Sequence, residues 1–111
     1  MLSSDLEEII KGVQAKNPTL TQFGFGGKGD IRPRAVGLCI EWILIVDGLE
    51  RRKTVNEKRS SYGYKHDVER HFNEYVANGE FICAALYLGY KMKVRGPNAW
   101  FNIKQLSRKK L

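Results

Sequence analysis

The chain has 111 residues, enough for one domain with a single hydrophobic core and too few for two. Hydrophobic residues make up 42% and charged residues 28%, which is typical of a globular protein and excludes an intrinsically disordered chain. The formal net charge of +7 is uneven: residues 1–50 hold five Lys or Arg against seven Asp or Glu, and residues 51–111 hold fourteen against five.

No targeting or membrane segment is predicted. The N-terminus lacks a basic segment followed by an apolar one, as a signal peptide would have. The longest apolar run, residues 36–46, is interrupted by Glu41 and is about half the length of a membrane-spanning helix. We therefore expect a soluble protein with no membrane partner.

Cys39 and Cys83 are the only cysteines, and both lie in apolar helical patterns where a reduced thiol acts as a small hydrophobe. Neither histidine has the spacing to them that a zinc finger needs, so no metal site and no cofactor are predicted. We expect buried, inert thiols in a reducing cytoplasm.

A first helix is predicted for residues 4–15. Ser4 and Glu7 match the capping box S-x-x-E, which would satisfy two free backbone N–H groups. The apolar residues that repeat at helical spacing are Leu6, Ile9, Ile10 and Val13. Asn17-Pro18 ends the helix, and no chemistry is assigned to it.

Residues 19–34 begin with a predicted short strand and become rich in glycine. Gly24, Gly26 and Gly29 match G-x-G-x-x-G, but that fingerprint needs a strand–turn–helix–strand unit, and no second parallel strand is evident. A mobile surface loop is the favoured interpretation. The milder alternative is a phosphate contact by backbone amides together with the cations of this segment, Lys28, Arg32 and Arg34.

Residues 34–48 are predicted to form the central helix. As a strand they would place Glu41 on an apolar face, whereas a helix puts it on a narrow stripe with Gly37 and Gly48. Trp42 is then a core anchor, and Glu41 belongs to the solvated stripe, with a catalytic carboxylate as the minor alternative.

Residues 49–60 form a polar, basic linker in which Thr54 and Val55 add a predicted short strand. Its cations are Arg51, Arg52, Lys53, Lys58 and Arg59. Such a cluster suits phosphate binding through counterion release, and a solvated loop is the alternative.

A third helix is predicted to start at Ser60 or Ser61, either of which can cap it. Its core face comprises Tyr64, Val68, Phe72, Tyr75 and Val76. The opposite, exposed ridge comprises Tyr62, His66, Arg70 and Asn73. A ridge that pairs an aromatic ring with cations suits phosphate or base contact.

The two histidines are expected to differ. His66 points away from the core face, where a ligand can reach it and where it is a weak candidate for a general base. His71 lies at the edge of the core face, four residues after Asp67, so we expect a partly buried pair.

Asn78-Gly79 predicts a tight turn through left-handed backbone, followed by a fourth helix. The residues of this helix expected in the core are Phe81, Ile82, Ala85, Leu86 and Leu88. Its expected exposed side is Glu80, Cys83, Ala84 and Tyr87. A carboxylate, a thiol and a tyrosine do not suit a helix that recognises DNA bases.

Gly89 ends the fourth helix, and residues 90–94 and 99–103 then predict a hairpin with a four-residue loop at 95–98. One face of the first strand is basic, and Trp100 lies beside it, which makes a wing-like surface. The cations of this surface are Lys91, Lys93 and Arg95. Residues 104–111 form a basic tail that we expect to be partly disordered.

These elements predict an α+β fold: a mostly helical single domain, residues 1–111, of about four helices with a C-terminal β-hairpin. The order helix–turn–helix–hairpin is compatible with a winged-helix-like arrangement.

The leading functional hypothesis is a small nucleic-acid-binding protein that holds phosphates with the 51–59 loop, the ridge of the third helix and the hairpin. The partner would be DNA or RNA, bound mainly through its backbone. The candidate binding residues are Arg51, Arg52, Lys53, Lys58, Arg59, Tyr62, Lys65, His66, Arg70, Lys91, Lys93, Arg95 and Trp100.

Two alternatives stay open. One is a regulatory module that binds a protein partner or a second copy of itself through Tyr62, Tyr87 and Trp100. The other is a small nuclease-like hydrolase with His66 as general base and Lys65 or Arg70 stabilising charge. No nucleophile–base pair is evident, so a binding protein is favoured over an enzyme.

Overall fold

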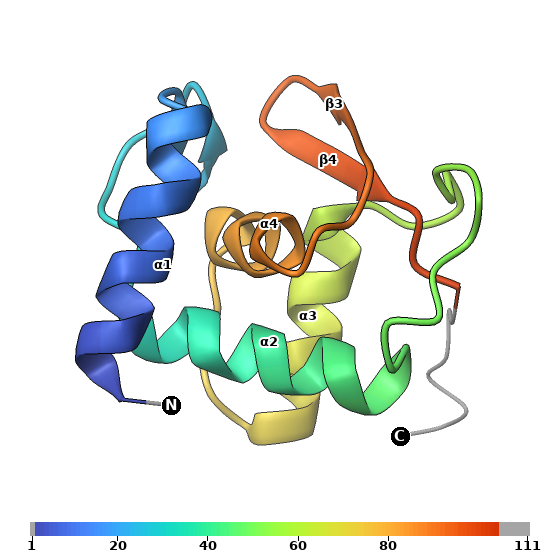
Figure 1. Ribbon diagram of the computed structural model, residues 1–111, viewed down its shortest axis with the longest axis horizontal. Helices are drawn as coiled ribbons and strands as arrows, with labels where there is room; N and C mark the ends of the chain where they lie inside the picture. Colours follow the sequence, from blue (N-terminus) through green and yellow to red (C-terminus); the bar gives the residue numbers. More distant parts are fainter. Residues whose placement is uncertain (1, 105–111) are drawn as a thin grey trace.

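Four helices and two short hairpins follow one another along the chain in the computed structural model, which describes residues 2–104 (Figure 1). The elements are α1 (Ser3–Lys16), β1 (Leu20–Thr21), β2 (Gly24–Phe25), α2 (Pro33–Val46), α3 (Ser61–Phe72), α4 (Asn78–Tyr87), β3 (Met92–Arg95) and β4 (Asn98–Phe101). The fold is α+β and mostly helical, as predicted. The predicted basic tail lies outside the described residues except for Lys104.

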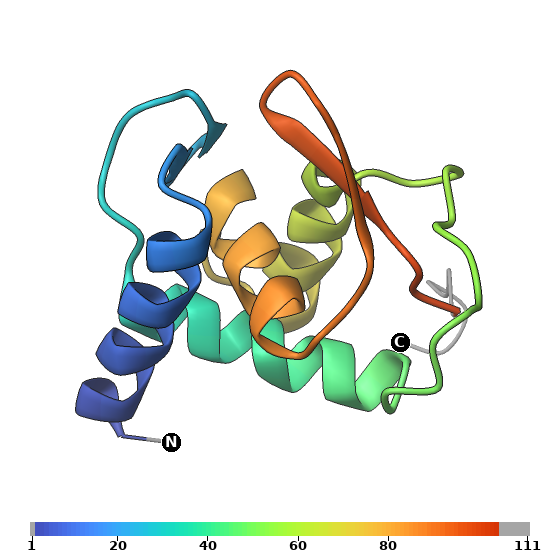
Figure 2. The same ribbon diagram turned by 45° about the horizontal axis from the view of Figure 1, so that its top comes forward.

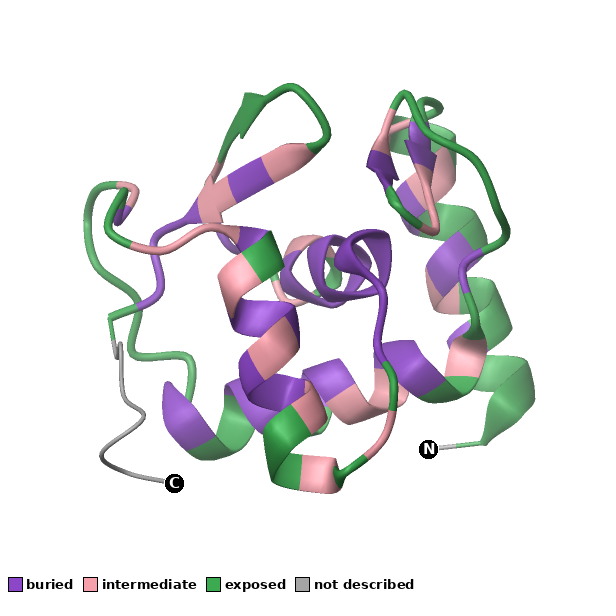
Figure 3. Ribbon diagram, turned by 180° about the vertical axis from the view of Figure 1, so that it is seen from behind, coloured by how far each residue is buried: buried purple, intermediate pink, exposed green. Residues whose placement is uncertain are grey.

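Helix α4 lies at the centre of the molecule, with α1, α2 and α3 packed around it (Figures 1 and 3). All eight residues from 78 to 85 are buried, including Glu80, Cys83 and Ala84, which we expected on an exposed side. That prediction is wrong for every member except Tyr87. Small side chains let the neighbouring helices approach α4 on all sides, and the charge of Glu80 is neutralised by a partner.

Helix α2 supplies many of the buried core residues, as the apolar pattern predicted. Trp42 is buried and Glu41 is exposed, so the solvated stripe was assigned correctly. Four rings from four elements meet where α2, α3 and α4 come together: Trp42, Tyr64, Phe81 and Phe101. The Tyr64 and Phe81 rings stack with centroids 5.3 Å apart, and such pairs add stability beyond the area they bury.

The chain reverses between α3 and α4 at Asn73, not at Asn78-Gly79 as predicted. Asn73 has φ of 53° and ends α3 in left-handed backbone, while Asn78 and Gly79 form the first turn of α4. Because α3 ends early, Tyr75 lies outside the helix and is exposed, although Val76 is buried as expected.

Gly79 is required for a close approach of two chain segments. Its N–H donates to the carbonyl of Gln22 at 2.8 Å. A Cβ at this position would lie 1.7 Å from the Thr21 carbonyl oxygen, closer than any side chain tolerates. The β1–β2 hairpin therefore rests directly on the first turn of α4, as Figure 2 shows.

Three further details differ from the predictions. Helix α1 has Leu2 as its N-cap with no side-chain cap, so the Ser4 capping box does not form. Residues 54–55 form no strand; instead Asn56 makes a single bridge with Phe101. The C-terminal hairpin is tighter than expected, because its strands pair up to Arg95 and Asn98 and leave a two-residue turn.

The glycine-rich segment is part hairpin and part loop. Leu20 pairs with Phe25 and Thr21 with Gly24, which confirms the predicted short strand and adds a second strand to it, while residues 26–30 form an exposed loop as expected. Gly24 has φ of 113°, and a Cβ there would lie 2.3 Å from the carbonyl oxygen of Pro97. The tips of the two hairpins are therefore in contact.

Glu80, at the start of α4, is a charged residue that is fully buried. One carboxylate oxygen accepts from the backbone N–H and Nε of Arg32, at 2.7 and 2.9 Å. The other accepts from Arg32 Nη2 at 2.7 Å and from the N–H of Ala77 at 2.8 Å. With both oxygens fully engaged, burial of this carboxylate is compensated.

Gly79→Ala should destabilise the protein strongly, by about 3 kcal/mol, because the methyl group would push β1 away from α4. Gly12→Ala is the matched control: Gly12 lies in an exposed part of helix α1, where an added Cβ meets nothing within 4 Å. The control should gain about 0.5–1 kcal/mol from helix propensity. Urea unfolding measures both, and equal free energies of unfolding would contradict the proposed close approach.

Arg32→Met should cost about 3 kcal/mol, because it leaves a buried carboxylate without its charged partner. The control is Arg34→Met, which breaks the Arg34–Glu74 pair of the same bidentate geometry at the surface. Because that pair is exposed to solvent, its loss should leave the urea midpoint unchanged. Similar midpoint shifts in both variants would show that burial of Glu80 is not what makes the pair important.

Candidate nucleic-acid interface and adjoining cavity

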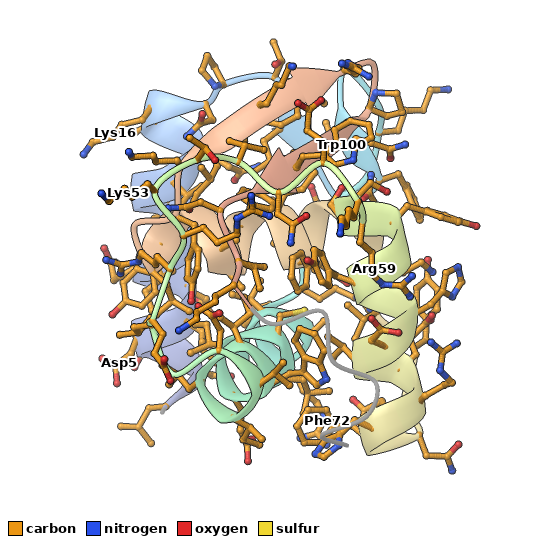
Figure 4. The ribbon with its side chains drawn as sticks, turned by 90° about the vertical axis from the view of Figure 1, so that its right-hand side faces the viewer. Asp5, Lys16, Lys53, Arg59, Phe72 and Trp100 are labelled. Atoms are coloured by element: carbon orange, nitrogen blue, oxygen red, sulfur yellow. The ribbon has the colours of Figure 1, made fainter. Side chains whose placement is uncertain are left out.

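The basic linker is bound along the C-terminal hairpin. The N–H of Arg52 donates to the Asn102 carbonyl at 2.8 Å, and Asn102 Nδ2 returns a bond to the Arg52 carbonyl at 2.8 Å. Farther along, the N–H of Asn56 donates to the Phe101 carbonyl at 2.8 Å. Two basic segments some forty residues apart thus form one surface. Figure 4 shows the linker running from Lys53 toward Arg59 beside Trp100.

We call this surface the basic face and define it by six cations: Arg52, Lys53, Lys58, Lys91, Lys93 and Arg95. Its cations are exposed, and one carboxylate, Glu57, lies among them. Lys93 Nζ and Arg95 Nη2 both lie 3.2 Å from the same Glu57 oxygen, and Lys91 Nζ donates to the Lys53 carbonyl at 2.9 Å. Within residues 2–104, Arg52, Lys53 and Lys58 form no ion pair, so the face carries an excess of positive charge.

Trp100 forms part of this face. It lies directly opposite Lys93 in the β-ladder, so the two side chains project from the same side of the hairpin. The Arg95 guanidinium carbon lies 5.6 Å from the Trp100 ring centroid. An aromatic ring flanked by cations is a suitable platform for a base and its phosphate.

Arg51 and Arg59, both predicted as phosphate ligands, have structural roles. Arg51 Nη2 donates to the Leu88 carbonyl at 2.6 Å, which caps the end of α4. Arg59 makes a bidentate pair with the buried carboxylate of Asp67, at 2.8 Å for both bonds. Their guanidinium groups are therefore already engaged, and we leave them out of the basic face.

The predicted ridge of α3 is also largely engaged in ion pairs. Lys65 is only 7% exposed and lies 3.4 Å from Glu69, and His66 Nδ1 lies 2.8 Å from the same carboxylate. Arg70 is exposed but pairs with Asp67. Tyr62 is exposed as predicted.

His71 does not form the predicted pair. It is exposed, and its ring packs against Phe72 with centroids 4.6 Å apart. Asp67 is instead bound by Arg59 and Arg70, whose guanidinium groups outcompete an imidazole for a buried carboxylate.

A cavity of about 480 Å³ adjoins the basic face at the tip of the C-terminal hairpin. It is lined by Phe23, Tyr62, Lys65, Tyr75, Asn78, Pro97 and Asn98. Of these seven residues, sequence reasoning predicted only Tyr62 and Lys65 as binding residues. The others come from the β1–β2 turn, the α3–α4 connection and first residue of α4, and the tip of the C-terminal hairpin, and no local pattern links these segments.

The two thiols offer no reactive group. Cys83 is buried, and its pKa is raised to about 12, first by burial and then by the charge of Glu80. Burial also raises the pKa of the Cys39 thiol well above its usual range. Among the described residues, no group of three or more His, Cys, Asp or Glu is arranged to hold a metal ion.

Comparison with known proteins gives no relative. No family model, no curated protein and no solved structure matches the chain. Within residues 2–104, no helix combines the length and apolarity that crossing a membrane requires.

Neither thiol should react with a disulfide reagent in the folded protein at about pH 8, because both are buried and protonated there. Both should react in about 6 M guanidinium chloride, where their pKa values return to the ordinary range. Counting released chromophore measures this directly. Rapid labelling of either thiol under native conditions would mean that the α2–α4 core opens locally.

Proposed function

We propose that this protein binds nucleic acid through the basic face. The observation that carries the proposal is the local charge balance: six Lys or Arg and one Glu on a surface built from two distant segments. Exposed cations with so little acid among them can neutralise phosphates and release their counterions. The half-buried Trp100 between them adds a ring on which a base can stack.

This proposal includes fewer binding residues than the one based on sequence. We leave out Arg59 and Lys65, whose charged groups pair with carboxylates, and Arg51, whose guanidinium lies against the end of α4. The hairpin and the linker remain, and the ridge of α3 contributes Tyr62 alone. Residues 79–85 of helix α4 contribute no base contacts because they are buried in the core.

The alternative of a protein-binding module keeps part of its support. Residues 78–85 of the fourth helix are buried, so that helix offers only Tyr87 as an exposed aromatic side chain. Tyr62 is exposed as well, and the charge balance of the basic face favours nucleic acid as the partner.

Lys53→Ala/Lys58→Ala should weaken binding to a labelled oligonucleotide and flatten its salt dependence. Each phosphate contact contributes about 0.7 to the slope of log K against log salt for single strands and about 0.9 for duplexes, so the slope should fall by up to about 1.4 for single strands and about 1.8 for duplexes. Fluorescence anisotropy between about 50 and 200 mM salt measures this for single-stranded DNA, RNA and duplex.

The matched control is Lys11→Ala/Lys16→Ala, which removes the same charge from exposed positions on α1. It should leave the slope unchanged. Equal effects of the two double substitutions would mean that total charge matters and the basic face does not. Absence of binding at low salt would overturn the proposal altogether.

A further inference from the structure

The cavity beside the basic face has the size and composition of a small-molecule site. Its volume of about 480 Å³ lies within the range of ligand pockets, and it mixes aromatic rings with a few polar groups. Three of its rings are roughly half exposed: Phe23 at 50%, Tyr62 at 53% and Tyr75 at 49%. Three solvated rings around one hollow favour a flat ligand that covers them.

The buried lysine of the cavity decides the charge of that ligand. Lys65 Nζ lies 5.4 Å from the Tyr62 ring centroid and 4.9 Å from that of Tyr75. The cation–π positions on these rings are therefore filled by the protein itself. A cationic ligand would meet the Lys65 charge, so the cavity suits a neutral or anionic planar group.

Asn78 supplies a hydrogen-bond acceptor with no partner. Its side chain is buried, at 6% exposure, and Nδ2 donates to the Pro97 carbonyl at 3.1 Å and to Asn98 Oδ1 at 3.0 Å. These two bonds fix the orientation of the amide and leave Oδ1 without a partner among the described residues. An unpaired buried acceptor is costly, and a ligand N–H that reached it would remove that cost.

Asn98 supplies a donor beside this acceptor. Its Oδ1 accepts from Asn78, and its Nδ2 forms no hydrogen bond with any residue in the described part of the chain. The cavity thus presents an amide acceptor next to an amide donor. Every nucleobase has an edge with an N–H group beside a ring nitrogen or carbonyl acceptor, which is the complementary arrangement.

The position of Asn98 connects the cavity to the basic face. Asn98 lies opposite Arg95 in the β-ladder, and Trp100 lies opposite Lys93 one step farther along the same side of the hairpin. A strand whose phosphates contact Lys93 and Arg95 therefore passes the mouth of the cavity.

We infer that the cavity binds one unpaired base of a single-stranded nucleic acid. The base stacks on the rings of Tyr62, Tyr75 and Phe23, and its edge meets Asn78 and Asn98. A base within a duplex cannot enter, so the site confers a preference for single strands. The inference rests on the proposed function, because the basic face supplies the phosphate contacts that lead the strand to the cavity.

The test compares two labelled DNA strands of about 12 nucleotides, one of ordinary mixed sequence and one abasic throughout, which share the same phosphates. The protein should bind the base-bearing strand about tenfold more tightly. Tyr62→Ala should lower the affinity for the base-bearing strand several-fold, leaving only the preference that stacking on Trp100 supplies, without changing the salt slope, because stacking involves no counterion release.

Tyr87→Ala is the matched control: it removes a tyrosine that is 46% exposed and lies outside this cavity. It should bind both strands as the unsubstituted protein does. Phe23→Ala, at another exposed ring, should repeat the effect of Tyr62→Ala, and circular dichroism checks that each variant is folded.

The outcomes separate the two proposals. Equal affinity for both strands, with a steep salt slope, would overturn base binding and leave the basic face standing. A preference for bases that is undiminished in both Tyr62→Ala and Phe23→Ala would place all base contact elsewhere, at Trp100, and would also overturn the inference. Failure to bind either strand would overturn both proposals, and tight binding of a trimethyl-lysine peptide would identify the cavity as a site for cations instead.

Discussion

The carboxylate of Glu80, buried at the start of α4 and neutralised by Arg32, determines where the rest of the chain packs. It accepts the Ala77 N–H within its own helix turn, at the positive end of the α4 dipole. Its other bonds reach across to the segment that leads into α2. One side chain thereby joins the connection after α3, the beginning of α4 and the beginning of α2, and the surface pair of Arg34 and Glu74 adds a second polar link between α2 and that connection.

The two hairpins and the proposed base-binding cavity lie around Glu80. Gly79, one residue before Glu80, donates its N–H to the β1–β2 hairpin. Asn78 donates its side-chain amide to the tip of the C-terminal hairpin. Both hairpins therefore pack against the first turn of α4. The cavity exists because the two tips and the α3–α4 connection converge there without filling the space between their aromatic side chains.

Periodicity in the sequence was sufficient to predict the number and order of the helices. It did not predict burial correctly where a residue's environment depends on partners that are distant in the sequence. Helix α2 was predicted correctly because its buried apolar residues and the exposed Glu41 follow helical spacing. In α4, a carboxylate, a thiol and an alanine resemble a solvated face, and nothing local reveals that Arg32, some fifty residues earlier, neutralises the carboxylate. Asn78-Gly79 has the composition of a turn, but here the glycine accommodates a neighbouring backbone while Asn73 provides the left-handed conformation.

The same limit applies to the cations. Counting Lys and Arg identified the basic half of the chain but could not separate Arg59, which binds Asp67, from Lys58, its neighbour in sequence with no ion pair in the described region. The cavity was beyond prediction because its lining comes from four separate segments, and the pairing of Asn78 with Asn98 exists only once both hairpins are in place.

The distribution of acids, more than that of bases, gives the molecule its electrostatic direction. Of the five Asp or Glu residues after position 50, Asp67, Glu69, Glu74 and Glu80 all pair with cations on the side of α3 and the start of α4, and Glu57 alone lies on the basic face. Those four pairs cancel most of the charge on their side. The surplus is left on the hairpin and its linker, and a field of this kind would attract a polyanion to one surface and orient it as it approaches. A chain with the same net charge but with Glu69 and Glu74 placed beside Lys93 would have no such direction, so under the proposed function the internal ion pairs of α3 and α4 would contribute to recognition even though they contact no ligand.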